Sequence, residues 1–580
     1  MNIFKDYSKI LIIFLFTYFL ILNLFQLSQQ HWSSMLDQDI KMMYNSLLIS
    51  SGIEQEYRDH PAYTTFFLLG SIFKICSIFF DNFTVQEILN SKNIDENLQT
   101  LFIIGRIVNG VYVFLVAFII FNILKELNVK KYICIFSTLI IVLFQDTYEL
   151  LFLIRSEILS LLMILLFLYF LIKFIKTNEI KYTLLSGFFL CFSMLAKIQV
   201  IFLFVTFLIS LPFLINHFKV QKQKNNLIYG KNYYILCFSL LVLFLSSYVL
   251  FQILLGIAML NEANDPRFYF TYNIDLFLFL IFLIFYSLFI KILSVKKIIN
   301  SSKIIITISS VLSGFILCMI FIFFLDLINL IPFNKLNIMR LTNPIEYMTR
   351  FTLLDAGKMI DTNIFDSLIR YLHGSGGLAD IRFNKSYEKT MIFYLDARIF
   401  FRTLHLLFFI FLIYYSSKIV KNNNLNFLSI SLFFGIFFLF LSFNLRETHG
   451  YNIYLFPLYV IVASITFDKL KNKSVAIFYV FLSIIFISEN LIISNIHKNV
   501  FAREPRIYDI CVIEKWKNSK NYKDNYNKIS YISLVNFPER WFKIYTKRFD
   551  DKFFEKYCDQ LLNEAGNRPQ LYKLNKAKNY

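Results

Sequence analysis

The segment ILIIFLFTYFLILNLFQL, residues 10–27, decides the class of fold. It carries no charged residue, and an uncharged apolar run of this length is long enough to cross a bilayer as a helix. A short basic stretch, residues 2–9, precedes it, and Ser-Gln-Gln-His-Trp follows it at residues 28–32. A secretory signal peptide would end in small residues at a cleavage site. We therefore predict a retained first span with its N-terminal end on the inner side.

Long apolar runs continue along the chain to about residue 494. The 580 residues are 57% hydrophobic and include 71 Phe. Soluble proteins average roughly 45–50% apolar residues, so this excess indicates a lipid environment. The runs do not show the ten-residue alternating segments of a transmembrane β-barrel. The predicted class is an all-α polytopic membrane protein.

The net charge is +19, from 58 Lys and Arg against 39 Asp and Glu. Much of the positive charge lies in short loops between apolar runs, where Lys and Arg set membrane orientation. No basic stripe with interleaved aromatic residues lies outside the runs, so we expect no nucleic-acid binding. The predicted inner loops are 125–131, 173–181, 219–231, 291–303, 418–421 and 469–473.

The sidedness of these loops fixes the predicted order of spans. One span, 101–124, separates the first outer region, 28–100, from the first inner loop. The apolar segment 62–80 is then a juxtamembrane or re-entrant helix on the outer side. Lys197 is expected at the outer turn of a two-span hairpin between residues 182 and 219. The other expected spans are 132–147, 156–175, 233–256, 275–292, 304–330, 401–417, 426–443, 452–467 and 474–493.

This order gives about 13 membrane helices and an outer C-terminus. We predict two domains. The transmembrane module, 1–494, includes the first outer region, 28–100, and a large outer loop, 331–399. A small extracytoplasmic C-terminal domain, 495–580, is polar and aromatic, with a short strand-like run at 529–535.

A cluster of charge follows the first span. It contains Asp37-Gln38-Asp39, then Tyr44, then Glu54-Gln-Glu-Tyr-Arg-Asp-His-Pro61. Charged residues beside the membrane are costly to bury and usually functional. Carboxylates can take a proton from an acceptor hydroxyl, and cations can stabilise a phosphate leaving group. The predicted topology collects further outer charges at Arg58, His60, Arg106, Arg155, Glu157, Lys197, Arg446 and His449.

The order and sidedness of these motifs resemble the GT-C superfamily of integral-membrane glycosyltransferases. That superfamily includes the lipid A aminoarabinose transferases, the protein O-mannosyltransferases and the oligosaccharyltransferase catalytic subunits. Asp37-Gln38-Asp39 resembles the acidic pair in their first outer loop, and Tyr44 and His60-Pro61 resemble residues of the aminoarabinose-transferase branch. Further segments resemble the order of motifs in this superfamily: Arg106, 155–157, 187–197 and 446–457.

The resemblance implies an inverting glycosyltransferase that uses a polyprenyl-phosphate-linked sugar donor and a lipid, glycan or protein acceptor. Its active site would face the extracytoplasmic side, here of a bacterial inner membrane. Asp39 or Asp37 would be the general base, and either could help to bind a divalent cation, Mg²⁺ or Mn²⁺. The donor phosphate would contact Arg58, His60, Lys197 and Arg446, with Tyr44, Arg155, Glu157 and His449 as further site residues.

Several of these residues also have structural interpretations. Asp37 and Asp39 are favoured at a helix start, and Lys197 is a possible interface anchor. Arg155 and Glu157 are close enough in sequence to pair locally at a helix end.

Two alternative functions stay open. A flippase or transporter of lipid-linked glycans would place charges within its spans. An O-antigen polymerase or ligase would centre on the 331–399 loop. The acidic pair in the first outer loop favours the transferase.

Overall fold

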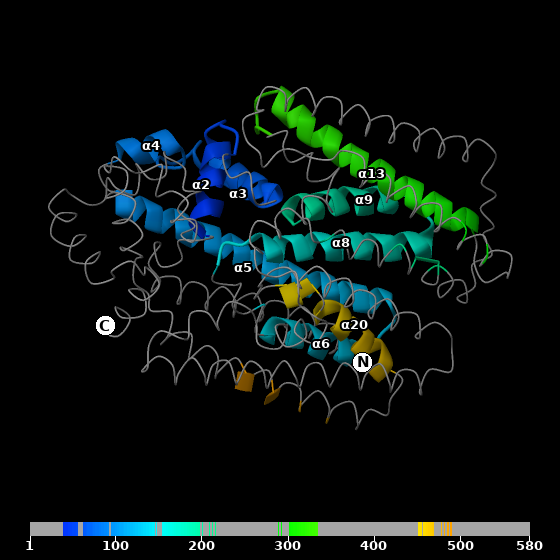
Figure 1. Ribbon diagram of the computed structural model, residues 1–580. Coiled ribbons are helices and arrows are strands. Elements are labelled where there is room, and N and C mark those ends of the chain that lie inside the picture. Colours follow the sequence, from blue (N-terminus) through cyan, green and yellow to red (C-terminus); the bar gives the residue numbers. More distant parts are fainter. Residues whose placement is uncertain are drawn as a thin grey trace, which may run out of the picture.

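The computed structural model describes residues 39–55, 62–91, 94–144, 153–197, 301–333, 451–454 and 456–468, with a few single positions elsewhere. Within these ranges every regular element is a helix, and no strand occurs (Figure 1). Three helices are long and apolar enough to cross a membrane: α5 (Ile94–Glu126), α8 (Ser156–Thr177) and α13 (Ser301–Leu327). The described part is therefore all-helical with three candidate membrane spans, as expected for an integral membrane protein.

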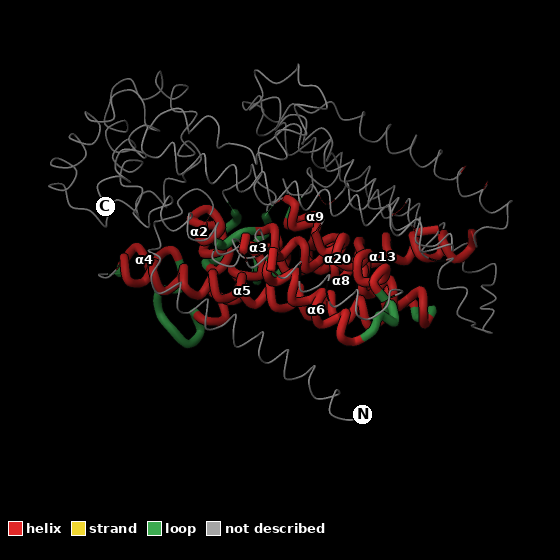
Figure 2. The backbone as a smooth tube through the Cα atoms, turned by 90° about the horizontal axis from the view of Figure 1, so that it is seen from below, coloured by secondary structure: helices red, strands yellow, loops and turns green. Residues whose placement is uncertain are grey.

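Shorter helices complete the described part. They are α2 (Asp39–Ser50), α3 (Tyr63–Cys76), α4 (Val85–Asn90), α6 (Lys131–Leu143), α9 (Ile180–Ala196), the 3-10 helix η3 (Tyr451–Tyr454) and α20 (Phe456–Phe467). Figure 2, turned by 90° from Figure 1, shows these helices gathered side by side with the three long ones.

The predicted spans agree with some of these bounds and not with others. α8 matches 156–175 and α13 matches 304–330, whereas α5 begins before residue 101. The span predicted at 132–147 is wrong in length, because α6 has 13 residues and ends at Leu143, where Phe144 turns to extended backbone. At about 1.5 Å per residue α6 is about 20 Å long, less than a bilayer core of about 30 Å.

Other predictions fall outside the described ranges, apart from single helical positions. These are the spans 233–256, 275–292, 401–417, 426–443 and 474–493, and also the first span, most of the 331–399 loop and the tail 495–580. The total of about 13 membrane helices therefore stays a prediction.

α8 and α9 form the centre of the described assembly, and they run antiparallel. Near one end the hydroxyls of Ser160 and Ser193 lie 3.3 Å apart, and farther along Ser186 donates to the carbonyl of Phe167 at 2.9 Å. α5 packs against α8, and α13 packs against the other side of α9 (Figure 1). The contact of α9 with α8 thus uses small hydroxyl residues, as helix interfaces in membranes commonly do.

Two glycines let α9 and α13 approach backbone to backbone. A Cβ atom on Gly187 would lie 1.8 Å from the carbonyl oxygen of Val311, and one on Gly314 would lie 2.0 Å from that of Leu184. No side chain fits at such distances, so glycine is required at both positions. The sequence predicted neither contact.

Asparagine ends each of the three long helices. Asn178, the residue after α8, has φ of 59° and its amide donates to the carbonyl of Phe174. Asn128 and Asn329, just beyond α5 and α13, have φ of 57° and 53°. Asparagine tolerates this left-handed conformation, which closes the last helical turn.

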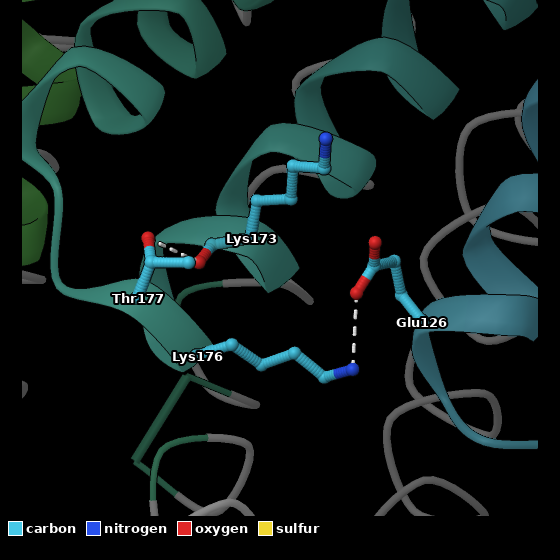
Figure 3. Close-up of polar contacts among 4 residues, drawn as sticks. All are labelled: Glu126, Lys173, Lys176 and Thr177. Carbon is cyan, nitrogen blue, oxygen red and sulfur yellow. Dashed lines mark hydrogen bonds and ion pairs between the residues drawn. The ribbon is translucent and has the colours of Figure 1, made fainter.

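Lysines gather at one end of the assembly. Lys176 of α8 pairs with Glu126 of α5 at 3.0 Å (Figure 3), and Lys303 of α13 donates to the carbonyl of Ile175 at 3.0 Å. The amide of Lys130 donates to Asp468, beyond α20, at 2.9 Å. The segments 125–131, 173–181, the start of α13 and the end of α20 thus share one end, as the predicted inner loops require.

α2 and α3 pack against each other at the opposite end. Thr64 of α3 donates to the carbonyl of Phe192 in α9 at 2.6 Å, and the ring of Tyr63 lies edge-on to that of Phe333 at 4.7 Å. α3 has 14 residues, about 21 Å, too short for a full span. It lies within residues 62–80, where a helix is predicted, and its juxtamembrane or re-entrant placement stays a prediction.

Candidate functional site

A buried ion pair joins the beginning of α8 to the end of α9. Lys197 follows the last residue of α9, and its Nζ lies 3.0 Å from Oε1 of Glu157, in the first turn of α8. The two side chains are only 1% and 4% exposed. Burying two charges is favourable only when they are close and well oriented, so this pair fixes the two helix ends relative to each other.

The sequence interpretation of these residues needs two corrections. Lys197 was expected at the outer turn of a hairpin, with an interface anchor as the structural alternative; its side chain is instead buried against Glu157, which supplies the counter-charge. Arg155 and Glu157 were considered as a local pair, but the partner of Glu157 is Lys197, forty positions along the chain. Arg155 forms no ion pair with Glu157 within 4 Å, although its guanidinium is close enough to act on the carboxylate through its charge.

The start of α8 holds further polar atoms that make no hydrogen bond with any described residue. Oγ of Ser156, Oε2 of Glu157 and Nε of Arg155 are all buried without a hydrogen-bond partner among the described residues. Buried polar atoms are normally hydrogen-bonded, and leaving one unpaired costs roughly 1–3 kcal/mol. A ligand that supplies both acceptors and donors would remove this cost.

The local charge favours an anion. The guanidinium of Arg155 and the ammonium of Lys197 lie around the single carboxylate of Glu157. α8 has 22 residues and no side-chain cap at its N-terminus, so the first amide groups add a partial positive charge. A phosphate is the kind of group that helix N-termini and arginine bind together.

α5 contributes another arginine near the start of α8. Arg106 is fully buried and lies 5.6 Å above the ring of Phe102. Asn109, one turn further along α5, donates to the carbonyl of Leu153 at 2.7 Å, just before the start of α8. This hydrogen bond ties the middle of α5 to the segment that carries Arg155.

Three more elements reach this region. α3 contacts both α8 and α9, η3 contacts α8, and α2 contacts α5. A Cβ atom on Gly105 of α5 would meet Met43 of α2 at 2.9 Å and Ile154 at 2.7 Å, so these segments are in direct contact. The start of α8 is therefore where helices from the beginning, middle and end of the chain meet.

Several predicted site residues can be placed only through their neighbours. α2 begins at Asp39, which agrees with the helix-start interpretation of this residue, while its side chain lies outside the described residues. Asp37, Arg58, His60, Arg446 and His449 also lie outside them. α3 starts three residues after His60, and η3 starts two residues after His449.

Tyr44, another predicted site residue, lies in the apolar core. Its side chain is fully buried among the hydrophobic residues of α2 and its neighbours. A buried position of this kind favours a packing role over direct contact with a substrate.

Tyr63, which the sequence reasoning missed, is close to the same end. Its hydroxyl is buried and makes no hydrogen bond with a described residue. Burial, and next the carboxylate of Asp326, raise the pKa of Tyr63, so the phenol stays protonated. Its position two residues after Pro61 was the only available signal.

A metal site is not found among the described residues, where no group of three or more His, Cys, Asp and Glu side chains gathers. The side chains of Asp37 and Asp39 lie outside that part of the chain. The predicted Mg²⁺ or Mn²⁺ therefore stays a prediction.

Comparison with known proteins adds no assignment. No protein-family description matches the chain, and no curated protein matches it.

Proposed function

We propose that the chain is a glycosyltransferase that moves a sugar from a polyprenyl phosphate to a lipid, glycan or protein acceptor. In this proposal it has the GT-C plan of about 13 membrane helices, in a bacterial inner membrane, with its active site on the extracytoplasmic side. The reaction would proceed with inversion at the anomeric carbon of the sugar.

The observation that supports the proposal is the buried charge cluster at the start of α8. Arg155 makes no hydrogen bond or ion pair with any described residue, and Ser156 and Glu157 each have an unpartnered buried oxygen beside it. A donor with one phosphate and several sugar hydroxyls carries both the anion and the hydrogen-bonding groups that these atoms lack.

The buried pair also changes the expected roles of the cations. Since Glu157 already compensates the charge of Lys197 at 3.0 Å, we assign the main phosphate contact to Arg155. Lys197 then holds the end of α9 in place and adds to the positive field. Arg58, His60 and Arg446 keep their proposed roles, because α3 and η3, which follow them, both contact α8.

The chemical step needs a base and a stabilised leaving group. The acceptor hydroxyl oxygen attacks the anomeric carbon, and the bond from that carbon to the phosphate oxygen breaks. The electron pair of that bond leaves with polyprenyl phosphate, whose charge Arg155 stabilises. The proton of the acceptor hydroxyl goes to the carboxylate of Asp39 or Asp37.

The proposal is tested by measuring sugar transfer in membranes that contain single variants. One of Asp39→Asn and Asp37→Asn should lower the rate by roughly 10²- to 10⁴-fold, because a general base is lost. Glu179→Gln, at the opposite end of the helices, is the matched control and should keep the full rate. Wild-type rates in both aspartate variants, at equal expression, would rule out the assignment.

A further inference from the structure

The lysine-rich end of the described helices carries more positive charge than its acids can balance. Its lysines outnumber its acids by seven to three: Lys125, Lys130, Lys131, Lys173, Lys176, Lys181 and Lys303 against Glu126, Glu179 and Asp468. This excess lies at the end opposite the candidate site, so it belongs to a separate surface.

Each of the three acids already has a partner. Glu126 pairs with Lys176 at 3.0 Å, Glu179 pairs with Lys181 at 2.5 Å, and Asp468 accepts a hydrogen bond from the backbone of Lys130. Figure 3 shows that Lys176 reaches Glu126, while the side chain of Lys173 leaves α8 in a different direction. Among the described residues, Lys173 therefore has no carboxylate partner.

Aromatic rings hold Lys173 in place instead. Its Nζ lies 4.8 Å from the ring centre of Tyr169 and 5.5 Å from that of Tyr182. Lys181 lies on the same ring of Tyr182, at 5.1 Å. Cation–π contacts orient an ammonium group without neutralising it. Because Lys181 also pairs with Glu179, the three charged groups together leave one net positive charge beside these rings.

A row of rings continues from this point along the line where α8 and α9 pack together. Phe170 stacks on Tyr182 at 6.1 Å and on Phe189 at 5.6 Å, and all three are only half-buried. Leu185, one turn beyond Tyr182, is 39% exposed. From Lys181 to Phe189 the row runs along about 12 Å of helix toward the middle of the bilayer.

We propose that Lys173, Lys181 and this row of rings bind an anionic phospholipid. The phosphate of the headgroup lies between Lys173 and Lys181, and one acyl chain lies along Tyr182, Phe170 and Phe189. Basic pockets between membrane helices on the inner side bind such headgroups. Lysines that only set the orientation of the protein in the membrane would need no aromatic neighbours. Here Lys173 lies between two tyrosine rings and matches a lipid headgroup, and the row of rings that follows matches an acyl chain.

The site is independent of the proposed glycosyl transfer, and lipid binding tests it directly. The full chain, purified in a non-ionic detergent, is mixed with phosphatidylglycerol or phosphatidylcholine, and retained lipid is counted by native mass spectrometry. We expect retention of phosphatidylglycerol over phosphatidylcholine. Lys173→Gln combined with Lys181→Gln should weaken phosphatidylglycerol binding by roughly thirtyfold, about fivefold for each lysine.

The matched control removes two lysines from the same end that are not part of the row of Tyr182, Phe170 and Phe189. Lys125→Gln combined with Lys131→Gln should weaken binding by less than about threefold, since only the distant field is reduced. Equal losses in the two double variants, or equal retention of the two lipids by the wild type, would overturn the site. Should the Lys173 and Lys181 double variant fail to fold, Tyr182→Leu decides, because unchanged phosphatidylglycerol binding there also overturns it.

Discussion

The ion pair between Glu157 and Lys197 leads to the sharpest prediction for stability. The two charged groups are 3.0 Å apart and almost fully buried. At an effective dielectric constant of about 20, two unit charges at this distance attract by about 5–6 kcal/mol before desolvation is counted. Glu157→Gln removes the carboxylate and leaves the buried ammonium of Lys197 and the guanidinium of Arg155 without the negative charge between them. We expect a loss of roughly 3–5 kcal/mol in the free energy of unfolding.

A double-mutant cycle measures this interaction directly. Glu157→Gln, Lys197→Met and the double variant are unfolded with SDS in mixed micelles, and the three free energies are compared with that of the wild type. The double variant should lose at least about 2 kcal/mol less than the sum of the single losses, because neither member of the buried pair is left without the other.

The chain contains a matched control for this cycle. Glu179 and Lys181 also form an ion pair, but their side chains are 47% and 65% exposed. Water screens this pair, so the same cycle there should give a coupling below about 1 kcal/mol. Coupling between Glu157 and Lys197 as small as that of the exposed pair would refute the buried cluster.

Two further predictions concern packing. Gly187→Ala should lower the free energy of unfolding by several kcal/mol in the same SDS titration, because the new methyl group would meet the carbonyl of Val311. In the control Gly52→Ala the new Cβ has no atom within 4 Å, so the free energy of unfolding should fall by only about 1 kcal/mol, the cost of a φ of 72° for alanine. Equal losses would show that α9 and α13 are farther apart. Thr64→Val should cost about 1–3 kcal/mol through loss of the bond to Phe192 and speed amide exchange in α3, and unchanged exchange would contradict that contact.

The sequence could predict those parts of the fold that depend on local pattern. α8 begins and ends near its predicted bounds because Glu157 opens a long apolar run and Lys176 and Asn178 close it. The lysine segments share one end, as the positive-inside rule requires. The bounds of α8 and the sidedness of the lysine segments both depend on residues close together in the sequence, so they can be predicted without knowing which helices are in contact.

Contacts between helices were not available from the sequence. Glu157 and Lys197 each stood out as a charge at the edge of an apolar run, but only the antiparallel packing of α8 and α9 shows that they are partners. The close approach of α9 and α13 at Gly187 and Gly314 could not be predicted either, since an isolated glycine in an apolar run does not indicate which helix packs against it. The full burial of Tyr44 in the core likewise depends on helices that lie far from it in the sequence.

The most direct measurement of the proposed function follows the donor itself. Purified full-length protein in liposomes is given a labelled polyprenyl-phosphate sugar and an acceptor mixture, and phosphorus NMR monitors the phosphate. The proposal predicts that the sugar phosphodiester is converted to free polyprenyl phosphate as the acceptor gains the sugar, and that Asp37→Asn combined with Asp39→Asn stops the conversion. A donor that crosses the bilayer intact, with no polyprenyl phosphate formed, would contradict the transferase and identify a flippase.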